Sequence, residues 1–142
     1  MPPLTRWTIR IAMLHLLLGL LGWLVYTYDQ VGTLPGNWSA LRPVGIHFIT
    51  VGWLTQLIFA VIFWMFPIIS RDNPYGEKWI AWLGFWGLNI GLWLRAVFVI
   101  GLSRGMFADA GWGLIGTGLI QWAGITAWVI VSWGRVKERG GR

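Results

Sequence analysis

Four long apolar segments constrain this chain more than any other feature. They cover residues 7–28, 41–69, 79–102 and 111–133, and each reaches the roughly 20 residues that an α-helix needs to cross a bilayer. Turn-forming residues separate them, including Pro35-Gly36-Asn37, Asn73-Pro74 and Arg104-Gly105. The pattern predicts an all-α fold, an integral membrane four-helix bundle in a single transmembrane domain.

The composition supports a membrane protein. Only 11% of the residues are charged and 56% are hydrophobic, whereas a soluble domain has about 25% charged residues. The 13 Trp and 20 Gly agree, because Trp favours the membrane interface and Gly lets helices approach closely. The absence of cysteine excludes disulfides, thiolate metal sites and covalently attached haem within this chain.

The basic residues predict the orientation. Eight of the 11 Lys and Arg flank the start of the first span, the second connection or the end of the fourth span, all on one side. By the positive-inside rule both termini are cytoplasmic, in the inner membrane of a prokaryote, and residues 134–142 form a short basic cytoplasmic tail. Since topology explains the net charge of +6, no nucleic-acid partner is expected.

His47 lies in the apolar stretch of residues 43–69, which contains no charged residue, and an imidazole there is a candidate functional group. With a rise of about 1.5 Å per residue, His47 and Arg95 fall in the same outer third of the membrane. His15 lies in the inner half, roughly 10–18 Å away along the membrane normal. One metal ion is therefore not expected to bind both histidines of one chain, and the sequence favours His47 over His15 as a ligand.

Small and polar residues form stripes at helical spacing. One stripe contains His15, Gly19 and Gly22, and others run through residues 84–95 and 113–128. We expect these faces to pack closely against another helix or a flat macrocycle. Asn89 and Gln121 fall near the midplane and are expected to hydrogen-bond across helices.

The sequence RPVGIHFITVGWLTQLIFAVIFWMFP, followed by LGFWGLNIGLWLR, resembles subunit I of the haem–copper oxidases. The similarity is greatest to the cytochrome cbb3 oxidase and nitric oxide reductase branch and covers roughly residues 42–95. That subunit has three four-helix arcs, and the second helix of each arc carries haem or copper ligands. The resemblance implies that the chain corresponds to one arc and that His47 binds the iron of haem b. Arg95 and Arg42 are then candidates for its propionates.

The chain also departs from that family. It has no adjacent pair of histidines and no Asp or Glu inside a span, so one chain cannot be a complete oxygen or nitric oxide reductase. The resemblance therefore implies electron transfer or a haem-dependent role in a homo-oligomer or a larger complex, while copper stays open. Two alternatives are a cofactor-free structural or assembly subunit of a respiratory or photosynthetic complex, and a bacteriochlorophyll-binding protein.

Overall fold

The computed structural model describes residues 1–32, 34–71, 73–107 and 110–136, and within these ranges all regular structure is helical. The first span is α1 (Pro3–Asp29). The second is a continuous rod of α2 (Leu41–His47), the π-helix η1 (Phe48–Thr55) and α3 (Gln56–Met65). The third and fourth are α4 (Lys78–Ser103) and α5 (Ala110–Trp133).

In the described part of the chain four helices are long and apolar enough to cross a membrane, so the predicted multi-pass helical fold is confirmed. The bounds differ most at two places: the first span begins at Pro3 rather than at residue 7, and the second stops at Met65 rather than at residue 69. The early end of the second span has a local cause. Phe66 has an extended backbone with ψ of 150°. The reason is Pro67, whose ring disfavours helical backbone at the preceding residue.

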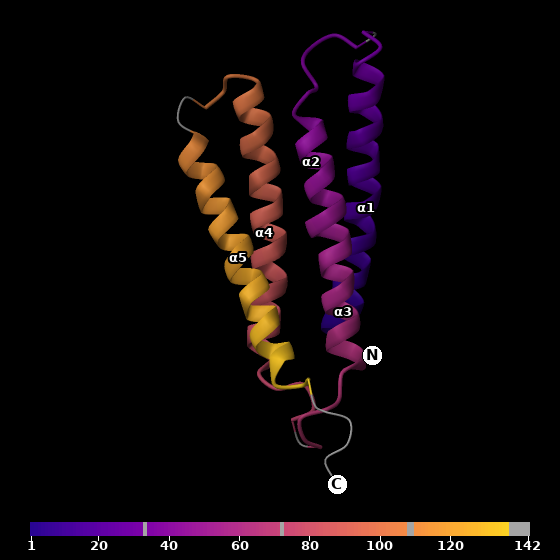
Figure 1. Ribbon diagram of the computed structural model, residues 1–142, viewed down its shortest axis with the longest axis vertical. Coiled ribbons are helices and arrows are strands. Elements are labelled where there is room, and N and C mark those ends of the chain that lie inside the picture. Colours follow the sequence, from indigo (N-terminus) through magenta and orange to yellow (C-terminus); the bar gives the residue numbers. More distant parts are fainter. Residues whose placement is uncertain (33, 72, 108–109, 137–142) are drawn as a thin grey trace.

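The helices form two hairpins (Figure 1). The first pairs α1 with the α2–η1–α3 rod, and the second pairs α4 with α5 along most of their lengths. The start of α1 and the end of α5 lie at the same end of the bundle, which we call the terminal end. Contact between the hairpins is made mainly by α4 against α2 and η1, whereas α1 and α4 touch only lightly.

Glycines bring α4 and α5 into close contact, as the stripes of small residues in these two spans predicted. A Cβ on Gly124 would lie 2.8 Å from the backbone nitrogen of Leu88, and a Cβ on Gly87 would lie 3.0 Å from Cα of Gly124. No L side chain fits between backbones at this distance. The stripes therefore serve helix–helix contact in this hairpin.

The middle of the second span is a π-helix eight residues long. π-helices are rare, usually a single turn, and frequent at functional sites. The Thr55 hydroxyl donates to the Thr50 carbonyl, five residues earlier, at 2.9 Å. This segment faces α1, so its wider turn places backbone carbonyls beside the side chains of α1.

Arg135, counted in the basic tail by the sequence, is fully buried at the terminal end. Its guanidinium donates to the carbonyls of Phe63, Phe66 and Pro67 at 2.9, 2.7 and 3.1 Å. It also lies 5.6 Å from the ring centroid of Tyr75. Arg135 of the predicted tail is thus part of the packed structure, and residues 137–142 lie outside the described chain.

Candidate functional site: a histidine at a groove between α1 and α4

His15 lies on α1 with its side chain fully buried against the π-helix. Its Nδ1 is 3.2 Å from the carbonyl oxygen of Gly52. A Cβ on Gly52 would lie 2.8 Å from Cβ of His15 and 2.8 Å from Cδ2 of Leu92. Only glycine therefore lets η1 approach α1 closely enough to make this contact.

A pair of amides lies beside the imidazole. Asn89 of α4 and Gln56 of α3 exchange two hydrogen bonds, each 3.3 Å long. Asn89 also donates from Nδ2 to the Phe85 carbonyl at 2.7 Å, which fixes the orientation of its amide and, through it, that of Gln56. The interhelical hydrogen bond predicted for Asn89 is confirmed. Gln121 is buried, but its Nε2 has no partner within the described chain.

The hydrogen bonds at Nδ1 determine the state of the opposite ring nitrogen. Gln56 Nε2 approaches Nδ1 at 3.4 Å, but the shorter contact is to the Gly52 carbonyl, which can only accept a hydrogen bond. We therefore assign the proton to Nδ1. In this tautomer Nε2 carries a lone pair. Nε2 is buried and has no hydrogen-bond partner among the described residues.

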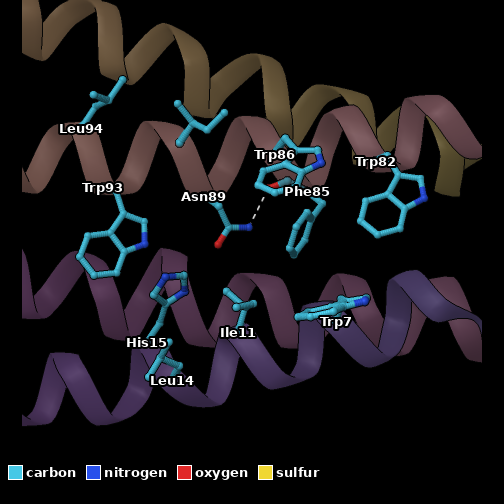
Figure 2. A pocket seen from close by; sticks show the side chains of 11 residues that line it. Trp7, Ile11, Leu14, His15, Trp82, Phe85, Trp86, Asn89, Trp93 and Leu94 are labelled. Atoms are coloured by element: carbon cyan, nitrogen blue, oxygen red, sulfur yellow. Dashed lines mark hydrogen bonds between the residues drawn. The ribbon is translucent and has the colours of Figure 1, made fainter.

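A groove of about 630 Å³ borders this histidine (Figure 2). His15, Ile11 and Trp7 rise from α1 on one side, and Trp93, Asn89 and Trp82 point down from α4 on the other. The groove exists because α1 and α4 belong to different hairpins and touch only lightly. The complete lining consists of Trp7, Ile11, Leu14, His15, Trp82, Phe85, Trp86, Asn89, Ile90, Trp93 and Leu94. None of these eleven residues is charged.

Two aromatic rings pack directly on the imidazole. The Phe48 ring lies edge-on with its centroid 5.2 Å away, and the Trp93 ring is tilted with its centroid 6.1 Å away. Phe48 and Trp93 also pack on each other, at 5.1 Å. His15 is thus enclosed by an aromatic cluster that draws one ring from the second span and one from α4.

His47 and Arg95 lie together, at a different place from His15. Both line a small cleft between α2 and α4 of about 30 Å³, which has room for one or two waters. Nδ1 of His47 lies 3.1 Å from the Pro43 carbonyl, and the side chain is partly exposed. The two histidines thus border different clefts, and their separation along the membrane normal stays a prediction. Arg42 is exposed and is not among the described residues that line either cleft.

Sequence reasoning missed the supporting partners of His15. Gly52 and Gln56 are in the same string that carries His47, but nothing in their spacing shows that they contact His15. Trp86 and Trp93 also line the groove.

No group of three His, Cys, Asp or Glu side chains in the described ranges is placed to hold a metal ion. A metal ion at His15 would thus need a cofactor to supply its other ligands. Comparison with protein-family models, curated proteins and solved structures gives no match to this chain.

Proposed function

We propose that this chain is a haem b-binding membrane protein, with His15 as the axial ligand in the groove between α1 and α4. One observation carries the proposal. His15 Nε2 is buried without a partner while Nδ1 is hydrogen-bonded to a backbone carbonyl. Histidines that bind metal ions almost always donate their other N–H in this way, which orients the ring and fixes the tautomer.

The groove suits a flat apolar ligand. Its volume of about 630 Å³ falls within the roughly 300–1,000 Å³ of small-molecule and cofactor sites. The indoles of Trp82, Trp86 and Trp93 offer broad apolar walls, and Asn89 is the polar lining residue besides His15. When bound, haem b would supply a one-electron redox centre. The chain's own residues would hold it, orient it and exclude water.

The haem assignment agrees with what the resemblance to oxidase subunit I implied, but it uses a different histidine. The cleft at His47 and Arg95 is too small for a tetrapyrrole within one chain. Ligation by His47 stays a prediction that requires a second chain to complete the walls of the site.

The proposal also includes the orientation and the assembly. From the basic residues, we propose that both termini face the cytoplasm of a prokaryote. From the resemblance to one arc, we propose that the chain acts as a homo-oligomer or as a subunit of a larger membrane complex. The mass of the protein–detergent complex measures how many chains assemble.

A second candidate ligand is bacteriochlorophyll, and one observation favours it. The groove lining contains no cation for the two carboxylates of haem, whereas the propionate of bacteriochlorophyll is esterified. For haem, the nearest basic residues along α1 are Arg6 and Arg10, which are exposed toward the terminal end. Pigment extraction from purified protein separates the two ligands by absorption.

The test compares purified wild type with His15→Gly and His47→Gly. We expect a reduced-minus-oxidised α band of b type in wild type and in His47→Gly, and its loss in His15→Gly. Added imidazole should restore the band in His15→Gly, because it fills the space left by the side chain. Circular dichroism and elution in detergent verify that each variant is folded.

Two outcomes contradict the proposal. If the wild-type protein is folded but colourless and does not take up added haem, the haem assignment is wrong. This outcome supports a cofactor-free structural or assembly subunit. Loss of the band in His47→Gly but not in His15→Gly moves the ligand to the cleft of His47.

A further inference from the structure

The imidazole of His15 is closed off from the groove that it borders. Its side chain is 0% exposed, and Nε2 is inaccessible although the groove beside it measures about 630 Å³. A metal ion cannot reach Nε2 until a neighbouring side chain moves. The question is which neighbour moves, since this residue then controls entry of the ligand.

Of the two rings that pack on the imidazole, only Trp93 borders the groove. Phe48 is 4% exposed and packs in a cluster with Leu92 and Ala96, so moving it would open a cavity between the hairpins. Trp93 is 46% exposed, and no hydrogen bond to its indole nitrogen is found in the described part of the chain. An exposed side chain without polar restraints changes rotamer easily.

We infer that Trp93 is the gate of the site: its indole covers His15 in the ligand-free chain and swings away to let a planar metallo-tetrapyrrole reach Nε2. The inference rests on the proposed function. Figure 2 shows the geometry, with Trp93 projecting from α4 toward His15 at one end of the groove, while Trp7 and Trp82 lie toward the other end. Rotation toward the open side keeps the indole beside the ligand, as a wall of the occupied groove.

Trp86 provides a matched comparison. It lies on the same helix, lines the same groove and is 55% exposed, but its ring packs on Phe85 rather than on the imidazole. Removal of Trp86 takes away a wall without uncovering His15. Trp122 of α5 is 68% exposed and is not among the groove residues, so it serves as the neutral control.

The experiment measures haemin binding to ligand-free protein in detergent, by stopped-flow absorption at the Soret band. Because the indole rotates quickly but covers His15 in most molecules, only the open fraction binds, and the association rate falls in proportion to that fraction. We expect Trp93→Ala to associate about tenfold faster than wild type, and Trp93→Phe to fall in between. Trp86→Ala should dissociate faster without associating faster, and Trp122→Ala should match wild type.

The outcomes separate the gate from the proposed function. Equal association rates in wild type, Trp93→Ala and Trp122→Ala overturn the gate and leave haem binding intact. The absence of any Soret change in wild type and in every variant contradicts the proposed function itself. Faster association in Trp86→Ala as well as in Trp93→Ala also overturns the gate, because the effect would then come from a wider groove.

Discussion

At the scale of single residues, the site depends on a contact that tolerates no added atom. Gly52 presents its carbonyl to His15 across a gap in which a Cβ would lie 2.8 Å from two side chains. Nothing along the sequence marks this glycine, because its neighbour in space is 37 residues away. The helical stripe containing His15 could be predicted, whereas its partner could not.

Replacing Gly52 by alanine tests that contact. Because the added methyl must push His15 or Leu92 aside, we expect a loss of about 1–3 kcal/mol in stability, and a weaker or shifted haem spectrum. Gly116→Ala is the control, since a Cβ there meets no atom within 4 Å. That change should stabilise its helix, by about 1 kcal/mol at most. Thermal unfolding in detergent measures both, and equal effects would contradict the packing argument.

The amide pair is a second residue-scale feature. Gln56→Leu leaves the Oδ1 of Asn89 buried without a donor, at a cost of about 1–3 kcal/mol, and Asn89→Leu does the same to the Oε1 of Gln56. Because the double variant leaves neither partner unpaired, its loss should be smaller than the sum of the single losses. A double-mutant cycle by thermal unfolding measures the coupling. Strict additivity would show that the two amides do not stabilise each other.

At the scale of elements, the sequence predicted the four spans to within about four residues, with the largest differences at the start of the first span and the end of the second. Hydropathy sets these lengths, because a helix in lipid must satisfy its own backbone and cross the apolar layer. The π-helix could not be predicted. Its residues, FITVGWLT, are as apolar as those of an α-helix, and α1 packs against α2 and α3 as well as against this segment.

The α4–α5 hairpin gives an element-scale prediction. In Gly124→Ala the methyl meets backbone, with Leu88 N at 2.8 Å and Gly84 O at 3.1 Å, and backbone cannot step aside as a flexible side chain can. We expect the two helices to separate and the melting temperature to fall. Gly118→Ala lies on the same helix with no atom within 4 Å of the new Cβ, and should be neutral or stabilising. If Gly118→Ala destabilised as much, helix propensity and not close approach would be responsible.

At the scale of the whole molecule, the groove arises from how the two hairpins meet. α4 packs on the second span and stands apart from α1, and this leaves the open side of the bundle where His15 lies. The depth estimate uses the rise of an ideal α-helix, and its separation of His15 from His47 along the membrane normal stays a prediction. It could not show which histidine borders a ligand-sized space, because that depends on the distance between helices of different hairpins.

Arg135 holds the terminal end of the two hairpins together. It connects the end of α5 to one carbonyl in the last turn of α3 and to two carbonyls just after that helix, and hydrogen bonds from a charged group contribute about 1.5–3 kcal/mol each. Arg135→Gln should therefore lower stability by roughly 2–4 kcal/mol, and Arg135→Lys should recover only part, because lysine lacks the planar fork.

Arg104→Gln is the control for Arg135, because Arg104 is exposed at the opposite end and stacks on Trp38 at 5.1 Å. Its loss should cost no more than about 0.5–1 kcal/mol. Thermal unfolding in detergent compares the melting temperatures of the three variants. The fraction of haem retained after heating shows whether the groove still binds its ligand. If Arg135→Gln and Arg104→Gln had the same melting temperature, the hydrogen bonds from Arg135 to the three carbonyls would not stabilise the bundle. If Arg135→Gln melted earlier but bound haem with unchanged affinity and rate, the terminal end would stabilise the fold without shaping the groove.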